Sequence, residues 1–531
     1  MAVFARAPCD MPVCPRTGRG PSIPTATWVL IAAIAGSSMM FIDGTAVNVA
    51  LPLVQRELHA GAGDLQWVVE GYTLFLCALI LVGGALGDRF GRRSVFVIGV
   101  ALFAAASLAC ALAPAIGFLI AARCVQGAGA AFATPGSLAL ISANFSGEAR
   151  GRAIGSWSGF SAVTAAVGPV LGGWLAQTFS WRSVFFINLP LALIVIAVAL
   201  LRVPESRDDD APRGIDLTGA ALATLSLGAL VLGLIGLQTE PHGRLYAALA
   251  FGGCALAVLF LAYERRIARD PMLRPDLFRS RPFVGANVYT FLLYAALGGS
   301  LYFVPFDLIN VQGYTPVAAG AALLPFIVIM FVASRWSGGL VNRIGARVPL
   351  VVGAAFAALG FLAFARTGIG GSYWTTFFPA AVLLGVGGAF FVAPLTTTVM
   401  DSVNVSEAGV ASGVNNAVAR TAGLVAIAGL GLVLAAAFDA RLDRESTQWP
   451  ASTKVAVAGE RSAILSGAIA TRDVPAEERD RVVGAIRVAY VAGFAVVMIA
   501  SALLAAAAGV LAAFWDLRLG GGGVAGAAAP K

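Results

Sequence analysis

Long apolar runs separated by short polar stretches dominate this chain. Fourteen of the runs are long enough to cross a lipid bilayer as α-helices, because a helical span needs about 20 apolar residues. The pattern therefore predicts an all-α integral membrane protein with fourteen membrane-spanning helices. The expected spans cover residues 27–54, 65–88, 94–113, 115–142, 151–177, 183–202, 215–237, 245–264, 283–311, 316–341, 348–366, 373–401, 406–438 and 485–515.

Composition supports a membrane protein and argues against several other classes. Hydrophobic residues make up 59% of the 531 residues and charged residues 12%, whereas a soluble domain has about 45–50% and about 25%. The net charge of +8 does not indicate a nucleic-acid partner, because the arginines fall in short loops between apolar runs. Four of the six cysteines lie inside apolar runs and the chain has only two histidines, so we expect no disulfide framework, no metal and no cofactor.

The distribution of basic residues predicts the orientation. If the N-terminal tail lies inside, most of the 36 Lys and Arg residues fall on the inner face, and the short outer loops hold only Arg56, Arg182, Arg244 and Arg366. Cytoplasmic loops carry an excess of Lys and Arg. We therefore expect a protein of the plasma (inner) membrane with both termini in the cytoplasm, a disordered tail at 1–26 and a second tail at 516–531.

Three separate motifs occur twice, which indicates an internal duplication. Residues 84–93 return at 338–347, an offset of 254 (338 − 84), with Asn342 where Asp88 stands. Two further pairs share an offset of 259 (394 − 135 and 407 − 148): Pro135 with Pro394, and Glu148 with Glu407.

The duplication predicts two six-helix bundles, at 27–202 and 283–515, with two extra central spans within 203–282. The segment 439–484 is the one long outer loop, and it is either a lid over an outer vestibule or a solvated spacer. Residues 476–487 can form a short amphipathic helix within it.

Residues 84–93 (Gly-Ala-Leu-Gly-Asp-Arg-Phe-Gly-Arg-Arg) place four charges in six positions, so their charged part cannot lie in hydrocarbon. A positive-inside turn explains the charge but not the spacing. The spacing resembles the loop between helices two and three of the major facilitator superfamily, G-x-L-[GA]-D-R-x-G-R-[RK]. This resemblance implies a conformational latch on the inner face, made by Gly84, Gly87, Asp88, Arg89, Gly91, Arg92 and Arg93.

In that family the acidic residue of the turn holds the inner side closed. By resemblance, Asp88 is expected to lie against the positive N-terminal end of a helix in the other half, or against an arginine. The alternative is a charge that only marks the interface. Asp401, at the end of another span, is expected to cap a helix or contact solvent.

Asp43 is one of the few charges inside a span, where an unpaired charge costs about 2.5–3.5 kcal/mol. Residues 41–52 around it resemble the L-D-x-T-x-V-N-x-A-L-P motif of the fourteen-helix drug:proton antiporter branch of the same superfamily. A buried carboxylate can alternate between protonated and ionised forms as access switches sides, so we expect Asp43 to carry the proton. The alternative is a structural hydrogen bond, for instance to Asn48.

Arg123 lies within the fourth expected span, and Arg123–Gly127 resembles the R-x-x-Q-G motif that the family uses in proton coupling. An arginine stays charged, so it can control proton binding at a nearby carboxylate. The alternative for Arg123 is a fixed structural ion pair.

The fifth expected span carries a pattern of small residues that resembles the antiporter motif G-x8-G-x3-G-P-x2-G-G. Glycines open a groove for close helix packing, and an internal proline bends a helix. The resemblance implies an exporter rather than an importer, and the alternative is ordinary small-residue packing. Threonine replaces one glycine of the pattern, which consists of Gly155, Thr164, Gly168, Pro169, Gly172 and Gly173.

Three further charges lie in or near spans. Glu70 and Asp307 could bind a proton or a cation, although a solvated position is the alternative, and Arg420 could pair with either of them or bind an anionic substrate. Aromatic residues around Asp307 suit flat lipophilic cations, but such residues face lipid as often. The candidate cavity residues are Tyr294, Tyr302, Phe306 and Arg420.

The sequence therefore predicts a major facilitator fold and a monomeric, proton-coupled exporter of small lipophilic or cationic drug-like compounds. Its partners are the substrate, protons and the bilayer. A dedicated exporter of one metabolite or antibiotic fits equally, and an uptake symporter of the same fold fits less well. A membrane-embedded enzyme or a receptor is the alternative from another class, and the chain has no ATP-binding G-x4-G-K-[ST] motif or Ser/His/Asp set.

Overall fold

The computed structural model describes residues 23–60, 62–207, 216–239, 243–268, 271, 273, 275–447, 449–450, 452–454, 457 and 476–515. Within these residues, fourteen helical segments are long and apolar enough to cross a membrane, which confirms the expected number. The predicted tail 516–531, residues 1–22 of the other predicted tail and residues 458–475 of the predicted outer loop lie outside the described residues. Residues 23–26, which were expected to belong to the disordered tail, form the start of the first helix.

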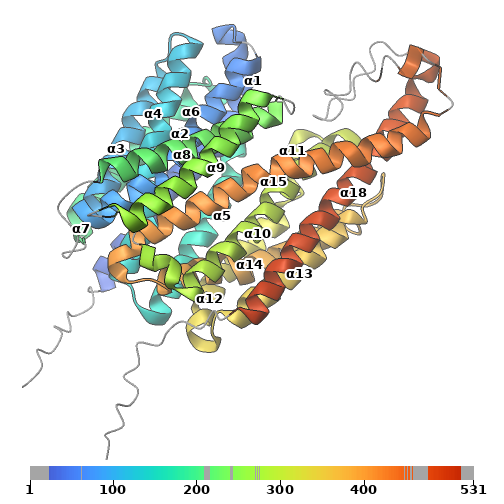
Figure 1. Cartoon of the computed structure of the whole chain (residues 1–531). Helices are drawn as coiled ribbons and strands as arrows, with labels where there is room; N and C mark the ends of the chain where they lie inside the picture. The colour runs from blue at the N-terminus through green and yellow to red at the C-terminus, as the bar shows by residue number, and fades with distance from the viewer. Residues whose placement is uncertain are drawn as a thin grey trace, which may run out of the picture.

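The helices form two bundles (Figure 1). The N-terminal bundle consists of α1 (Ile23–Leu58), α2 (Ala62–Phe90), α3 (Arg92–Ala111), α4 (Ile116–Asn144), α5 (Gly147–Thr178), α6 (Ser183–Phe186) and α7 (Asn188–Arg202). The C-terminal bundle consists of α10 (Arg281–Phe306), the π-helix η2 (Asp307–Val311), α11 (Pro316–Ala321), α12 (Leu324–Ile344), α13 (Arg347–Ala365), α14 (Phe377–Asp401), η3 (Val405–Glu407), α15 (Ala408–Glu445) and α18 (Ala476–Phe514).

Two extra helices, α8 (Leu217–Thr239) and α9 (Arg244–Arg266), lie between the bundles in sequence and form a hairpin. Helix α8 packs against α2 of the N-terminal bundle and α15 of the C-terminal bundle, so the pair covers the seam where the bundles meet. The short 3-10 helix η1 (Pro275–Arg279) leads from α9 into α10.

The structure refines several expected boundaries. The expected span 183–202 agrees with one membrane-crossing segment, Ser183–Arg202, in which α6 and α7 meet at Ile187. Span 283–311 ends in the π-helix η2, and span 316–341 begins as the separate helix α11. The outer loop is shorter than predicted, because α15 runs on to Glu445 and the expected short helix at 476–487 is the first part of α18.

The turn after α2 and its repeat after α12 have the same backbone feature. Gly91 has φ 114° and its counterpart Gly345 has φ 79°, a left-handed region that side chains with a Cβ atom rarely adopt. The repeated glycine therefore permits each chain reversal. We call the end of the molecule that contains these two turns the predicted cytoplasmic end.

The two bundles touch along two seams that approach the predicted cytoplasmic end, α2 with α15 and α5 with α12. Glycines face each other in both seams. A Cβ atom on Gly84 would collide with the carbonyl oxygen of Gly409, and one on Gly151 would collide with that of Gly338. Only glycine permits backbones to approach so closely, so both seams are tightly closed at this end.

Candidate functional site

Asp43 of α1 is the centre of a buried polar network. Arg123 Nη1 lies 2.6 Å from Asp43 Oδ2, and Gln126 Nε2 and Asn188 Nδ2 donate to Oδ1 at 2.9 Å and 2.8 Å. Ser107 Oγ accepts from the same Gln126 and Asn188 amides at 2.7 Å and 3.2 Å. Asp43 is 0% exposed and Arg123 1% exposed, so this pair is fully removed from solvent. A buried pair of this kind persists only when further hydrogen bonds satisfy both charges.

Arg123 of α4 links this network to α2. Its Nε donates to the backbone carbonyl of Val68 at 2.9 Å, and its Nη1 also donates to Gln126 Oε1 at 2.6 Å. The guanidinium carbon lies 4.4 Å from the centre of the Tyr72 ring, a cation–π geometry. The network therefore joins α1, α2, α3, α4 and α7 around one carboxylate.

The small residues of α5 lie directly against α1 beside Asp43. A Cβ atom on Gly172 would approach Ala46 Cβ to 2.7 Å, and one on Gly168 would collide with the hydroxyl of Thr45. Further along the same helix, Gly155 lies against the backbone of Ser334 in α12 of the other bundle. Helix α5 therefore connects the surroundings of Asp43 to the second bundle.

The other positions of this α5 pattern play no part in these contacts. Thr164, the departure from the pattern, donates its hydroxyl to the carbonyl of Phe160 at 2.9 Å in the same helix. Pro169 is exposed within the helix, and Gly173 lies near the side chain of Val49. Their placement fits helix packing more than direct contact with Asp43.

Asp88 joins the two bundles at the predicted cytoplasmic end. Its carboxylate accepts the backbone N–H groups of Gly409 and Val410, at 3.0 Å and 2.8 Å, in the first turn of α15. Arg92 Nε donates to Asp88 Oδ1 at 2.9 Å, and Arg92 Nη2 donates to the carbonyl of Val405. The carboxylate thus meets both of the expected partners, an arginine and the positive end of a helix from the other half.

Three other residues of this turn lie at the junction of α2 and α3. Arg93 N donates to Glu205 Oε1 at 3.0 Å, which fixes the start of α3. Gly87 and Arg89 lie in the last turns of α2, and a Cβ atom at Gly87 would meet nothing within 4 Å.

The repeated turn makes a weaker contact across the second seam. Asn342 Nδ2 donates to the carbonyl of Gly147 at 3.1 Å, and Arg343 Nη2 lies 2.6 Å from Glu148 Oε1 at the start of α5. The Arg343–Glu148 pair is largely solvent-exposed, in contrast to the buried carboxylate of Asp88. The two copies therefore close the same end with unequal polar contacts.

Comparison with known families decides the identity of the fold. The family model of the Major Facilitator Superfamily matches residues 33–428. The chain belongs to the Major Facilitator Superfamily. It is therefore a membrane transporter of small molecules and not an enzyme, and the predicted fold class is confirmed.

Several relatives align with this Major Facilitator Superfamily protein over most of both chains. The multidrug resistance protein Stp of Mycobacterium tuberculosis is 38% identical, covering 79% of this chain and 78% of Stp. The tetracenomycin C resistance and export protein of Streptomyces glaucescens is 34% identical, with 76% and 75% covered. The cephamycin export protein CmcT of Amycolatopsis lactamdurans is 36% identical, with 78% and 86% covered.

Solved structures support the same fold. The human organic anion transporter MFSD10 (TETRAN) superimposes with a TM-score of 0.58 at 14% identity, covering 93% of this chain and 99% of that one. The proton:xylose symporter XylE gives a TM-score of 0.53 at 15% identity, covering 92% and 94%.

A second link between the bundles of this transporter lies next to the Asp43 network. Arg420 of α15 is close enough to Tyr72 and Cys77 of α2 to act on both electrostatically. Its Nε is buried and donates no hydrogen bond to any residue that the structure describes. The expected pairing of Arg420 with Glu70 or Asp307 stays a prediction. Tyr72 is within electrostatic range of both Arg123 and Arg420.

Asp307 occupies a second buried site, in the C-terminal bundle. It is 0% exposed and is the first residue of the π-helix η2. Gln312 Nε2 donates to its Oδ2 at 3.4 Å, whereas Oδ1 receives no hydrogen bond from the described residues. Tyr490 of α18 is near enough to interact electrostatically with Asp307, and its buried hydroxyl is likewise unsatisfied within the described chain. π-Helical turns occur frequently at functional sites.

Two of the aromatic candidates, Tyr302 and Phe306, lie near this second site. The Tyr302 ring lies 5.3 Å from the Phe306 ring, and Tyr302 is close enough to Glu70 of the other bundle to interact with it electrostatically. Glu70 and Phe306 are half-buried, and so is Tyr294, which lies earlier in α10. These contacts bring Glu70 and the Asp307 site toward each other from opposite bundles.

Sequence reasoning missed three residues that the structure makes important. Asn188, Ser107 and Tyr72 complete the Asp43 network, but neutral residues within apolar runs carry no distinctive signal. The expectation for Asp401 as a cap or solvated charge is wrong, because Arg150 Nη1 lies 2.7 Å from Asp401 Oδ1, another contact between the bundles.

Among the described residues, no group of three His, Cys, Asp or Glu side chains could hold a metal ion.

Proposed function

We propose that this transporter is a proton-coupled exporter that moves small lipophilic or cationic compounds out of the cell by alternating access. In this proposal the bundles formed by 27–202 and 283–515 rock about a central path, and the α8–α9 pair within 203–282 covers one seam. The protein lies in the plasma membrane with both termini in the cytoplasm, acts as a monomer, and exchanges the substrate for protons.

The buried network around Asp43 carries this proposal. A carboxylate with no access to water in one conformation, held by Arg123 and two amide donors, can take up a proton only when the surrounding helices move. Protonation removes the charge that holds Arg123 in place, so the guanidinium is free to shift toward Tyr72. Proton binding and helix movement are thereby coupled at one site.

Tyr72 and Arg420 provide a path from this network to the second bundle. If Arg123 shifts, its contact with Tyr72 changes, and Tyr72 is within electrostatic range of Arg420 of α15. Helix α15 begins at the residues that bind Asp88. A change of charge at Asp43 therefore reaches the latch at the cytoplasmic end through one continuous helix.

Glu70 and Asp307 are assigned as additional proton or cation sites in this proposal. The unsatisfied oxygen of Asp307 supports this assignment, because an ionised carboxylate is costly to bury without a partner. A bound proton, or the positive charge of a substrate, would remove that cost. Tyr294, Tyr302 and Phe306 then supply aromatic surface to a lipophilic cation.

The direction of transport and the substrate class rest on the relatives. Their names describe multidrug resistance or the export of tetracenomycin C and cephamycin. Two of these names refer to one antibiotic each, so a dedicated exporter of a single metabolite is the second candidate. An uptake symporter has less support, because none of these three names refers to uptake.

The energetics suit this proposal. One proton that moves down a potential of about 100 mV supplies about 2.3 kcal/mol. That free energy supports roughly fifty-fold accumulation of a neutral substrate.

Transport in liposomes tests the proposal. The purified chain is reconstituted, a pH gradient is imposed, and movement of ethidium is followed for the wild type and Asp43→Asn. We expect the wild type to move the dye against its gradient and Asp43→Asn to fail. The matched control is Asp443→Asn, an exposed acidic residue near the end of α15, which should behave as the wild type.

Equal transport by Asp43→Asn and the wild type would contradict proton coupling at Asp43. If the wild type ignores ethidium and a panel of other lipophilic cations but moves one metabolite with protons, the dedicated-exporter candidate replaces the multidrug one. If no substrate addition moves protons, proton coupling itself is wrong.

A further inference from the structure

An apolar cavity of about 250 Å³ lies where the α8–α9 pair meets both bundles. Its walls come from five membrane-spanning helices and are almost entirely hydrocarbon. Residues that define it are Leu81 of α2, Ala223 of α8, Ala257 of α9, Phe291 of α10 and Val414 of α15. An apolar cavity does not hold ordered water, so at this depth in a bilayer its natural occupant is an acyl chain.

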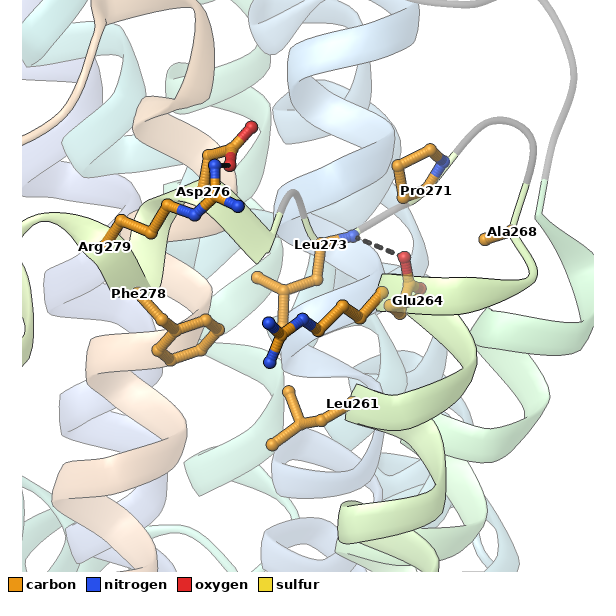
Figure 2. A pocket seen from close by; sticks show the side chains of 9 residues that line it. Leu261, Glu264, Ala268, Pro271, Leu273, Asp276, Phe278 and Arg279 are labelled. Atoms are coloured by element: carbon orange, nitrogen blue, oxygen red, sulfur yellow. Dashed lines mark hydrogen bonds and ion pairs between the residues drawn. The ribbon is translucent and has the colours of Figure 1, made fainter.

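A second, polar cavity of about 600 Å³ adjoins the first at the predicted cytoplasmic end. It lies between the end of α9 and η1, as Figure 2 shows, where Leu273 N donates to Glu264 Oε2 at 3.3 Å. Leu261, Leu273 and Phe278 line both cavities, so the polar and apolar spaces are continuous.

The polar cavity contains a guanidinium that has no partner among the described residues. Arg265, an exposed residue in the last turn of α9, makes no hydrogen bond or ion pair with any residue that the structure describes. Arg279 on the opposite wall pairs with Asp276 at 2.7 Å (Figure 2). Two arginines and the carboxylates of Glu264 and Asp276 therefore line one space at the edge of the membrane.

We propose that the two cavities together bind one phospholipid of the bilayer, with its phosphate at Arg265 and an acyl chain in the apolar cavity. Basic pockets between membrane helices on the cytoplasmic side bind lipid headgroups in this way. The charge of the described lining residues is balanced, with Glu264 and Asp276 beside the two arginines, and this favours a zwitterionic lipid with a primary ammonium group. The occupant we assign is therefore phosphatidylethanolamine.

The bound acyl chain contacts both sides of the α2–α15 seam. Leu81 lies two helical turns before Asp88, and Val414 lies one turn after Val410. Separation of these helices would open the apolar cavity and expose the chain. The lipid therefore favours the arrangement in which the seam is closed.

Lipid retention tests the inference without any measurement of transport, so its failure is distinct from failure of the proposed function. The full chain is delipidated in detergent and incubated with equal amounts of phosphatidylethanolamine, phosphatidylglycerol and phosphatidylcholine. It is then repurified, and bound lipid is measured by mass spectrometry. We expect one tightly held phosphatidylethanolamine, and about tenfold less after Arg265→Ala, because a charge-assisted contact to phosphate is lost.

Two matched controls isolate the site. Arg266→Ala removes the next basic residue of α9, which does not line the cavity, and should keep the lipid. Ala257→Phe fills the apolar cavity and should expel the lipid, whereas Ala255→Phe on the exposed face of α9 should not. Equal loss in the variants and their controls would overturn the site, and equal retention of the three lipids would overturn the choice of headgroup.

An experiment with a photoreactive acyl chain uses only the wild type, so its result does not depend on whether a variant folds. Phosphatidylethanolamine with a diazirine in its acyl chain is bound to the wild type and irradiated, and the modified peptides are mapped. Labels concentrated on α8, α9 and the first half of α15 would support the site. Labels spread evenly over the exposed faces of α3 and α13 would overturn it.

Discussion

The carboxylate of Asp88 in α2 accepts a hydrogen bond of 2.8 Å from the backbone N–H of Val410. Val410 lies in the first turn of α15, the helix on the other side of the seam. The carboxylate is only 6% exposed, so the contact is shielded from competing water. It combines a hydrogen bond to an ionised group with the positive end of a helix. A single side chain of one bundle thereby holds the start of α15 in the other.

Asp88→Asn is expected to weaken this closure. An amide can accept only one of the two N–H groups, and its own NH2 faces the other, so a loss of about 1.5–3 kcal/mol is expected. Transport should fall at least about tenfold while the amount of protein in the membrane is unchanged. Dye efflux and membrane immunoblots measure the two quantities. Unchanged efflux would show that the contact is not a latch.

Arg343→Ala should have a much smaller effect. The Arg343–Glu148 pair is 57% and 36% exposed, and such surface pairs contribute about 0.2–1 kcal/mol. Transport is expected to fall by no more than about fivefold, in the assay used for Asp88→Asn. A loss as large as that of Asp88→Asn would mean that the two seams contribute equally.

Asn188→Ala should impair coupling although Asn188 carries no charge. The variant removes the donor that lies 2.8 Å from Asp43 Oδ1 and leaves that buried oxygen with one donor fewer. We expect about a tenfold loss of proton-driven transport, since such a bond to a charged group is worth about 1.5–3 kcal/mol. The matched control is Asn144→Ala, whose amide, among the described residues, binds only the carbonyl of Leu140 in its own helix. Equal effects of the two variants would contradict a role at Asp43.

Gly172→Ala should destabilise the protein. The new methyl group would lie 2.7 Å from Ala46 Cβ, and overpacking of this kind costs about 1–3 kcal/mol. The unfolding temperature in detergent should fall by several degrees. Gly252→Ala in α9, where a Cβ atom meets nothing within 4 Å, should leave that temperature unchanged or raise it. A stable Gly172→Ala variant would show that α1 and α5 separate more readily than their contact indicates.

Asp307→Asn should raise stability while it lowers transport. The buried Oδ1 of Asp307 has no partner in the described part of the chain, so removal of the charge relieves a desolvation cost of about 1–3 kcal/mol. The unfolding temperature and dye efflux are measured on the same preparation, with Asp443→Asn as the control. A fall in both quantities would indicate that the carboxylate is structural.

The sequence was sufficient to predict the membrane spans and the two main charged sites. Charges are rare in apolar runs, so Asp43 and Arg123 were conspicuous, and the repeated turn identified Asp88. The roles of Asn188 and Ser107 could not be predicted, because a neutral polar side chain inside a span can form its hydrogen bonds with many partners, including the backbone of its own helix. Their role follows from how five helices pack, which the hydrophobic pattern along one helix does not encode.

The predicted ends of α15 and α18 were wrong for a related reason. Hydropathy indicates where a segment leaves the membrane hydrocarbon, but it says little about where the backbone hydrogen bonds of the helix end. Polar residues after position 438 ended the expected span, yet α15 continues to Glu445, and α18 begins at Ala476 within the expected loop. The pairing of Arg150 with Asp401 was likewise hidden, because the two residues lie 251 positions apart and in different bundles.

The length of α15 has a mechanical consequence. Its 38 residues span about 57 Å, nearly twice the roughly 30 Å of membrane hydrocarbon, and Gly409 lies at one extremity. Its far end runs beside α18 past the neighbouring helices (Figure 1). Because a helix of this length moves as one body, a small tilt at the seam displaces its far end by several ångströms. A fluorescent probe on the exposed tip would therefore report from one side of the membrane when the opposite side opens.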